Sequence, residues 1–243
     1  RYKQLADTIR FYKPSTILET GTWNGGRAIE MALAAFDRTD TVHYIGYDLF
    51  EDATVETDKE EFNAKPHNTR KAVEKRFDEF AEHMSKEKGK QFTYELYKGN
   101  VRDTLRPIFM EEVDFALMGS GNSIETVKHE YDILKTVPVV MGDHFFTKDD
   151  DDKTPDDKYQ GMKNLFDSIA TKKVNEEKTT EDGWTSFDEK AVVRKHVLPS
   201  DDKVLDGGRT HLVVFIHDEK LPDIPAELKQ VPIVVHPRDS VPK

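Results

Sequence analysis

The sequence predicts an α/β fold in which a mostly parallel sheet is covered by helices on both faces. Short apolar runs alternate with segments of helical periodicity from Thr16 to Ala170, and Gly, Asn or Asp follows several of the runs. Two late apolar runs, 190–199 and 209–218, are separated by the polar stretch "SDDKVLDGG" and are typical of antiparallel strands. Alternating strands and helices are typical of a parallel sheet with both faces buried.

The first two units of the chain follow this pattern. The opening segment "RYKQLADTIRFY" places Leu5, Ile9 and Tyr12 at spacings of four and three, which predicts a short amphipathic helix that ends before Pro14. The stretch "ILETGTWNGGRAIEMALAA" then begins as a strand and ends as a helix, with a glycine-rich turn at the join.

The middle of the chain supplies further strands and helices. Apolar or alternating runs predict strands, and helical patterns predict helices between them. The predicted strands are 41–50, 92–100, 113–119 and 137–146, and the predicted helices between them are 101–110 and 123–135.

Charged segments interrupt the alternation. Within 52–90, the residues Val73, Phe77, Phe80 and Met84 recur at helical spacing, which predicts a helix from about 68 to 86 preceded by a mobile loop. The run 147–161 carries too many like charges to pack and is predicted to be a solvated loop, with a metal site as the alternative.

The domain organisation follows from length and pattern. After the acidic run, Met162, Leu165, Phe166 and Ile169 resume helical periodicity. The chain of 243 residues suits one α/β core, so we expect a single domain over 1–243. Its expected additions are charged insertions at about 52–90 and 147–189 and an extended proline-rich tail at 221–243.

Composition narrows the class of partner and the compartment. The net charge is −11 with the acidic residues spread along the chain, which disfavours nucleic acid as a partner. No run approaches the roughly 20 apolar residues that cross a bilayer, so a membrane partner is not expected. The chain has no cysteine, which excludes disulfides and thiolate chemistry and favours a cytoplasmic location.

The glycine-rich turn is the first candidate ligand site. Gly21, Gly25 and Gly26 follow a predicted strand, where glycine lets backbone N–H groups and a helix N-terminus approach a ligand. The alternative is that glycine only lets the strand and helix pack closely. Trp23 breaks the G-x-G-x-x-G pattern of a dinucleotide-binding turn, and the Gly-Lys-Ser/Thr ending of a phosphate-binding P-loop is absent. The sequence therefore disfavours both kinds of phosphate site.

Acidic residues at the ends of two strands indicate a different ligand. Glu19 precedes the turn, where its carboxylate could face an ammonium group or an ordered water. Asp48 lies 27 residues beyond Gly21 and suits a carboxylate that accepts hydrogen bonds from a ribose diol, although it could simply cap the next loop. A ribose and an ammonium group without a phosphate indicate S-adenosylmethionine.

A third piece of the candidate site is "KGNVRDTL". The side-chain amide of Asn100 could read the edge of an adenine while Val101 packs on the ring. Alternatively, Asn100 is the N-cap of the following helix, a common role for asparagine. One residue could serve both purposes.

Six stretches in order resemble a known family. They are "LETGTWNGG", "YIGYDLFEDA", "YKGNVRDTL", "VDFALMGSGNSIETVKHEYDIL", "VVMGDHFF" and "YQGMKNLFD". Their order and spacing resemble class I S-adenosylmethionine-dependent methyltransferases, in particular those similar to macrocin O-methyltransferase. The resemblance implies a Rossmann-like three-layer α/β/α sandwich, whose mostly parallel seven-stranded sheet has an antiparallel C-terminal strand. It also implies cofactor contacts from Glu19, Gly21, Thr22, Trp23, Gly25, Asp48, Leu49, Asn100 and Val101.

The chain departs from this family after the fourth predicted strand. The position of the usual acidic residue is Gly119, and the position of the usual histidine is Asn122. Relatives that use a divalent ion add an Asp-Asp pair after the fifth strand, and here that pair is Asp143 and His144. Because magnesium prefers several oxygen ligands, the resemblance makes a divalent metal doubtful.

The chemistry that the resemblance implies is methyl transfer to a small hydroxylated acceptor, such as a sugar or another metabolite. His144 is the candidate base and Asp143 would orient it, unless the pair only closes a turn. Trp184 could cover the acceptor or anchor a loop. The alternatives are a degenerate binding or scaffold protein that keeps the cofactor pocket, and a nucleoside-binding enzyme with the same sheet. A homo-oligomer stays open.

Overall fold

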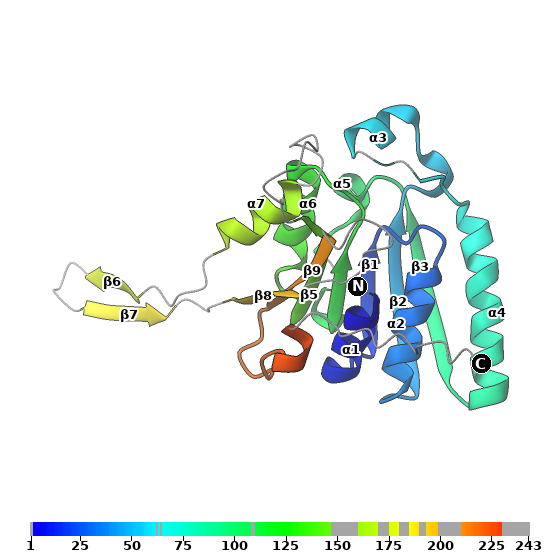
Figure 1. The fold of residues 1–243 in the computed structure, drawn as a ribbon, viewed down its shortest axis with the longest axis horizontal. Coiled ribbons are helices and arrows are strands. Elements are labelled where there is room, and N and C mark those ends of the chain that lie inside the picture. The colour runs from blue at the N-terminus through cyan, green and yellow to red at the C-terminus, as the bar shows by residue number, and fades with distance from the viewer. Residues whose placement is uncertain are drawn as a thin grey trace, which may run out of the picture.

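The structure is a computed structural model that describes residues 2–61, 63, 65–107, 110–146, 160–169, 175–179, 185–189, 193–198 and 210–229. Its main sheet has seven strands in the order β3-β2-β1-β4-β5-β9-β8 (Figure 1). The strands are β1 (Thr16–Thr20), β2 (Thr41–Asp48), β3 (Gln91–Lys98), β4 (Phe115–Met118), β5 (Val139–Phe146), β8 (Arg194–Leu198) and β9 (Thr210–Ile216).

The direction of the strands confirms the predicted sheet. Strands β1 to β5 pair in parallel, whereas β9 runs antiparallel to both of its neighbours, β5 and β8. Among the described residues, the last strand, β9, is therefore the reversed one. Since the crossovers between parallel strands are helical, both faces of the sheet become covered.

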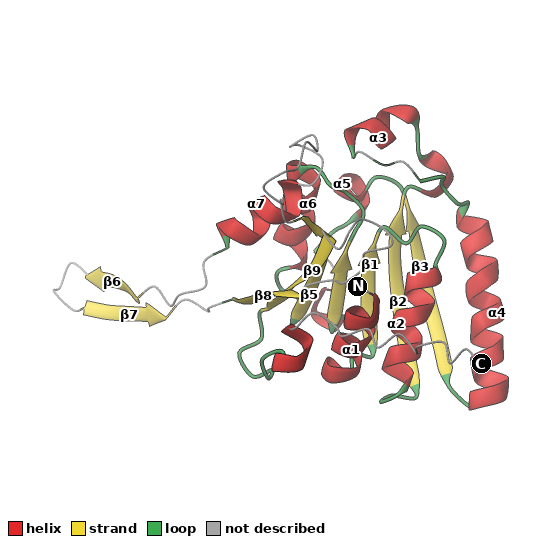
Figure 2. Ribbon diagram, viewed as in Figure 1, coloured by secondary structure: helices red, strands yellow, loops and turns green. Residues whose placement is uncertain are grey.

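Helices flank the sheet in two layers (Figure 2). One buried cluster joins the sheet to α1 (Tyr2–Tyr12), α2 (Gly26–Phe36) and α4 (Arg70–Lys88). The other joins it to α5 (Val101–Thr104), α6 (Ile124–Leu134) and α7 (Gln160–Ser168). The three-layer α/β/α arrangement is thus confirmed, with one apolar core on each face of the sheet.

The helices predicted at the start of the chain and over 68–86 form for the expected reasons. In α1, Leu5 and Ile9 are buried and the helix stops before Pro14. In α4, Val73, Phe77 and Met84 are buried while the charged positions between them stay at the surface. Apolar residues at helical spacing therefore identified the buried stripe of each helix.

Two local predictions were wrong. The helix expected over 101–110 ends after one turn, because Leu105 turns to an extended backbone and Pro107 cannot continue a helix. The loop expected before α4 contains a short helix, α3 (Val55–Glu60), which is capped by Thr54 and Thr57. None of the residues of α3 is buried, so no apolar periodicity marks it in the sequence.

The remaining elements are a separate two-stranded sheet and three short 3-10 helices among the described residues. A hairpin of β6 (Asn175–Thr179) and β7 (Thr185–Glu189) projects away from the main sheet in Figure 1. Short 3-10 helices occur at η1 (Phe50–Asp52), η2 (Met110–Glu112) and η3 (Ala226–Lys229), the last within the segment expected to be extended. The acidic residues 147–159, Trp184 and the tail from 230 lie outside the described residues.

No helix in the described ranges combines the length and the apolar character that a bilayer crossing requires.

Candidate functional site

The glycine turn brings the end of β1 directly against the loop after β4. Gly21 has a φ of 82°, and its N–H donates to the carbonyl of Tyr47 at 2.8 Å. A Cβ on Gly21 would overlap the carbonyl oxygen of Gly119 and lie 2.7 Å from its carbonyl carbon. A side chain at this position would therefore displace backbone, so close packing alone already requires glycine here.

The rest of the turn also packs tightly. Gly25 has a φ of 75° and is the N-cap of α2, and a Cβ there would press on the ring of Phe77 from α4. The Thr22 side chain points into the protein, where its hydroxyl shares a 3.0 Å hydrogen bond with Tyr44. Trp23 is the exposed residue of the turn, at 40% of its full surface.

Trp23 contacts the segment that follows α3. Its indole Nε1 donates to the carbonyl of Pro66 at 2.8 Å, and the Lys65 ammonium lies 5.2 Å from the ring centroid. The backbone of Trp23 has a φ of 52°, in the left-handed region that non-glycine residues seldom adopt. The first insertion is thereby attached to the exposed edge of the glycine turn.

Asp48 connects the ends of β1 and β2. Its Oδ2 accepts from the backbone N–H of Trp23 at 2.7 Å, and its Oδ1 accepts from the N–H of Phe50 at 2.7 Å. The alternative that Asp48 caps the following loop is therefore confirmed. Because a carboxylate has about four lone-pair sites, the ribose contact stays a prediction that this geometry permits. Leu49, which stays partly exposed, leads into η1 beside it.

Asn100 is the N-cap of α5. Its Oδ1 accepts from the N–H of Arg102 at 3.0 Å, which confirms the capping alternative. Val101 is buried in the core on the α6 side of the sheet, together with Tyr47 and Leu105. Recognition of adenine by these two residues stays a prediction.

Glu19 differs most from its expected surroundings. The carboxylate is fully buried, and its two oxygens accept from the Arg27 guanidinium and, at 2.5 Å, from the Tyr44 hydroxyl. Arg27 also donates to Asp143 Oδ2 at 2.9 Å and to the Gly21 carbonyl at 3.1 Å. The positive partner of Glu19 in this structure is thus Arg27 of the same chain.

The electrostatics of this cluster follow from its burial. Burial raises the pKa of Glu19, while the charge of Arg27 opposes that rise. Burial alone would lower the pKa of Arg27, but the charges of Glu19 and Asp143 outweigh it and raise the pKa above its ordinary value. Arg27 therefore stays protonated between the two carboxyl groups.

The sequence analysis missed both Arg27 and Tyr44. The signal for Arg27 is a charged residue one position into a helix that is otherwise rich in alanine and buried residues. The signal for Tyr44 is a phenol in the middle of a buried strand, since a buried hydroxyl requires a partner.

The candidate catalytic pair lies at the end of β5. The pairing of β5 with β9 shifts register between Gly142 and Phe145, and His144 has a φ of 63° at this irregularity. The N–H of His144 donates to Asp143 Oδ1 at 2.8 Å, and its Nε2 lies 3.9 Å from Asp143 Oδ2. The Asp143 carboxylate therefore contacts the backbone of His144 and lies near its ring, and the predicted role of Asp143 in orienting the imidazole stays a prediction.

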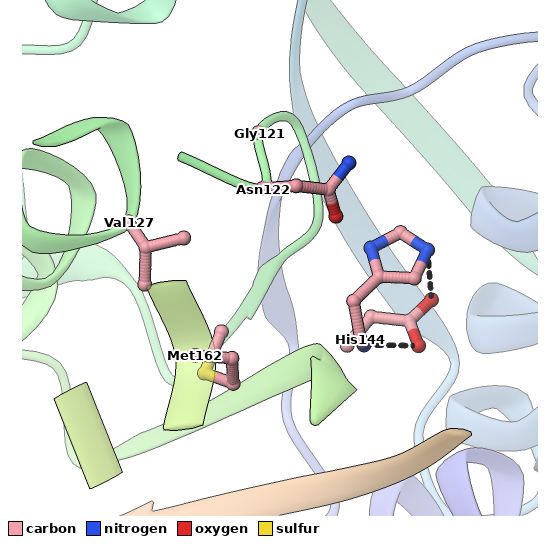
Figure 3. A pocket seen from close by; sticks show the side chains of 6 residues that line it. Gly121, Asn122, Val127, His144 and Met162 are labelled. Carbon is pink, nitrogen blue, oxygen red and sulfur yellow. Dashed lines mark hydrogen bonds and ion pairs between the residues drawn. The ribbon is translucent and has the colours of Figure 1, made fainter. Parts of the chain in front are cut away.

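A small hollow beside His144 forms the candidate acceptor end of the site (Figure 3). In that view the imidazole points toward Asn122, which comes from the loop after β4. The hollow is lined by Gly121, Asn122, Val127, Asp143, His144 and Met162. Polar groups from two strand ends and apolar side chains from α6 and α7 thus meet in one place.

The loop after β4 is held by the first insertion. Glu61, just after α3, accepts from the N–H groups of Asn122 at 2.9 Å and Ser123 at 3.1 Å. The Asn122 amide in turn donates to the Glu61 carbonyl at 2.8 Å. A carboxylate at the N-terminus of α6 is favourable because the unpaired N–H groups carry partial positive charge. Glu61 gave no sequence signal, since its partners lie some sixty residues away.

A metal does not fit the donors that the structure brings together. Among the described residues, no group of three or more His, Asp or Glu side chains is placed to hold a metal ion. Gly119 offers no carboxylate, and Asp143 Oδ2 faces the Arg27 guanidinium.

The sheet order and the reversed final strand define the class I methyltransferase fold, and the candidate site lies at the edge of the sheet where the parallel strands end. No protein-family model matches the sequence, and a search of curated proteins finds no match. Solved structures do share the fold.

One structural neighbour is the O-methyltransferase TomG from Streptomyces achromogenes, which is involved in tomaymycin synthesis and was solved with S-adenosylmethionine. The two chains are 14% identical with a TM-score of 0.50, over 89% of this chain and 79% of TomG. Another is an O-methyltransferase from Bacillus cereus solved with S-adenosylhomocysteine, at 13% identity and a TM-score of 0.51, over 88% of this chain and 80% of that protein. The fold is thus shared at low sequence identity.

Proposed function

We propose that the protein is an S-adenosylmethionine-dependent methyltransferase that methylates an oxygen of a small hydroxylated molecule, such as a sugar or another metabolite. The observation that carries this proposal is Asp48, whose carboxylate lies at the end of β2 against the glycine turn of β1. A carboxylate suits a ribose diol and repels a phosphate at this place. The fold shared with two O-methyltransferases supports the reaction class.

The proposed cofactor contacts divide into three groups. Asp48 and Leu49 would hold the ribose, and Asn100 and Val101 would hold the adenine. The backbone of Gly21, Thr22, Trp23 and Gly25 would flank the methionine end. Glu19 would act from beneath, through Arg27 and Tyr44, because its own carboxylate is fully buried. When bound, the cofactor supplies a methyl group carried on a sulfonium.

At the acceptor end, His144 is the proposed base. Its imidazole borders the hollow and would accept the proton of an acceptor hydroxyl. Asp143 fixes the backbone of His144 through the 2.8 Å hydrogen bond, and Val127 and Met162 provide an apolar wall. Alignment of acceptor and donor supplies most of the rate in such a displacement, so a rigid wall matters as much as the base.

Calorimetry tests the cofactor site. We expect the protein to bind S-adenosylmethionine and S-adenosylhomocysteine, and we expect an analogue without the ribose hydroxyls to bind roughly 10 to 100 times more weakly, because hydrogen bonds to a charged group are lost. In Asp48→Asn, the natural ligands and the analogue without the ribose hydroxyls should bind with similar affinity. The comparison forms a double-mutant cycle, so any structural cost of the substitution cancels. Asp52→Asn, an exposed neighbour that pairs with Lys98, is the matched control.

The result that would refute the cofactor assignment is an absence of binding for both natural ligands by a folded protein. Discrimination that persists unchanged in Asp48→Asn would remove Asp48 from the site.

A cofactor-binding protein without turnover is the second candidate function. It is favoured by Gly119, which offers no acid, and by Asn122, whose amide is engaged with Glu61. Transfer of a labelled methyl group to any hydroxylated acceptor by the unmodified protein would exclude it. Native mass spectrometry of the purified protein is the first step, because a retained ligand would show which acceptors to assay.

We also propose that the protein acts in the cytoplasm and on small molecules. Its net charge of −11 opposes binding to a nucleic acid backbone, and its lack of cysteine suits a reducing compartment. Failure of the protein to bind oligonucleotides at both low and high salt would support the statement that nucleic acid is not its partner.

A further inference from the structure

Arg27 lies where the ends of β1 and β5 bring two buried carboxyl groups together. Glu19 is fully buried and Asp143 is 3% exposed, and both accept hydrogen bonds from the guanidinium. The Arg27 side chain itself is only 17% exposed. A buried cation with two carboxylate partners is strongly held, because removing it leaves two buried charges uncompensated.

Arg27 also occupies the space next to Gly119. A Cβ at residue 119 would lie 2.9 Å from Arg27 Nη2 and 3.4 Å from the Thr20 carbonyl. Any side chain at 119 would therefore meet the guanidinium first. Two separate features of the sequence, an arginine at the start of α2 and a glycine at the end of β4, become one arrangement in space.

This arrangement competes with a metal ion for the same oxygen atoms. A divalent ion would require direct coordination by carboxylate oxygens at this end of the sheet. The Asp143 Oδ2 atom faces Arg27 Nη1 at 2.9 Å, and Oδ1 accepts from the N–H of His144 at 2.8 Å. An arginine stays charged under all ordinary conditions, so it does not vacate the site by losing a proton.

We propose that the guanidinium of Arg27 supplies the positive charge next to Asp143 at the acceptor end of the site, and that it thereby prevents a divalent metal ion from binding to Asp143. Arg27 is thus a positioning residue that holds Asp143 beneath His144. The exclusion of the metal depends only on the charges and contacts of the protein. The role in methyl transfer additionally rests on the function proposed above.

Binding of Mn²⁺, followed by electron paramagnetic resonance, tests the exclusion directly. The unmodified protein should leave the Mn²⁺ signal unchanged. Gly119→Asp should also bind no Mn²⁺, because the new carboxylate would lie against the Arg27 guanidinium and pair with it. Combining Gly119→Asp with Arg27→Ala should create Mn²⁺ binding. The matched control combines Gly119→Asp with Arg27→Lys, which keeps the cation and should bind no Mn²⁺.

Several outcomes would overturn the proposal. One is Mn²⁺ binding to the unmodified protein that Asp143→Asn abolishes. Another is Mn²⁺ binding to Gly119→Asp alone, since Arg27 would then fail to exclude the ion. A third is a folded Gly119→Asp/Arg27→Ala protein that binds no Mn²⁺. Circular dichroism establishes the fold of each variant, and if this double variant does not fold, the first two measurements still decide.

The test separates the cation proposal from the proposed function. S-adenosylmethionine affinity should be the same in EDTA and in excess Mg²⁺. An affinity that requires Mg²⁺ contradicts the role of Arg27 while leaving the cofactor assignment intact. Failure to bind the cofactor in either buffer contradicts the proposed function, whereas the Mn²⁺ result for Arg27 stands by itself.

Discussion

The substitution Gly21→Ala measures how closely the glycine turn packs against the loop after β4. Gly21 has a φ of 82°, and a Cβ there would lie 2.7 Å from the carbonyl carbon of Gly119 and 2.9 Å from the Cα of Ser120. Both atoms belong to backbone, so they cannot move aside as a flexible side chain would. The matched control is Gly89→Ala at the end of α4, where φ is 63° but a Cβ would meet nothing within 4 Å.

The two substitutions share one cost and differ in another. An alanine in the left-handed region costs about 1 to 2 kcal/mol, and this applies at both positions. Overpacking a tight site adds about 1 to 3 kcal/mol, and this applies only at Gly21. We therefore expect Gly21→Ala to lower the free energy of unfolding by about 2 to 5 kcal/mol and Gly89→Ala by about 1 to 2 kcal/mol.

Urea unfolding followed by circular dichroism gives both values. For a chain of this size, each 1 kcal/mol corresponds to a change in Tm of about 2 to 4 °C, so thermal unfolding provides a second measurement. Equal losses of stability for the two variants would refute the reasoning, because the contact with Gly119 would then cost nothing. We also expect Gly21→Ala, and not Gly89→Ala, to weaken cofactor binding.

Three further predictions concern polar groups that are buried or partly buried. Glu61→Gln should lower stability by about 1 to 2 kcal/mol, because it removes the charge that meets the N-terminus of α6. Tyr44→Phe should lower stability by about 1.5 to 3 kcal/mol, because the buried carboxylate of Glu19 loses a hydroxyl donor. Burial raises the pKa of Glu130 to about 7. Since the folded state then keeps a proton that the unfolded state loses, stability should fall as pH rises from about 4.5 to 7, by about 3 kcal/mol, and Glu130→Gln should abolish this fall.

Each of these three predictions has a control in the same chain. Glu87→Gln, at an exposed position of α4, should change stability by less than about 0.5 kcal/mol. Tyr97→Phe removes the hydroxyl of a tyrosine that is 39% exposed, and should cost less than Tyr44→Phe. Glu125→Gln, on the same helix as Glu130 but with a side chain 84% exposed, should leave the pH profile unchanged. If a control variant changes stability, or the pH dependence of stability, as much as its test variant does, the corresponding prediction is contradicted.

The sequence predicted the larger elements because their signal is local. Leu5 and Ile9 in α1, and Val73 and Phe77 in α4, mark a buried stripe through spacing alone. The same logic failed where no stripe exists, as in α3, and where a proline interrupts a helical pattern, as at Pro107.

Part of the candidate site was also visible in the sequence. Asp48 and Asn100 follow strand patterns, and the ends of neighbouring parallel strands must meet at one edge of the sheet. The pair Asp143 and His144 was identified through the family resemblance, in which an acidic pair follows the fifth strand, and the structure places both residues within β5. The structure adds that the two capping alternatives, for Asp48 and for Asn100, are both true.

The amino-acid sequence by itself indicated the parallel sheet and the strand ends that carry the polar residues, because both depend on periodicity within a few residues. The reversed last strand was expected from the family resemblance. Only the tertiary structure decided that Arg27 lies between Glu19 and Asp143, and that Gly119 leaves room for it. Those residues come from separate strands, helices and loops. The partner of a buried charge depends on which opposite charge the fold places next to it, and the local sequence pattern does not specify that contact.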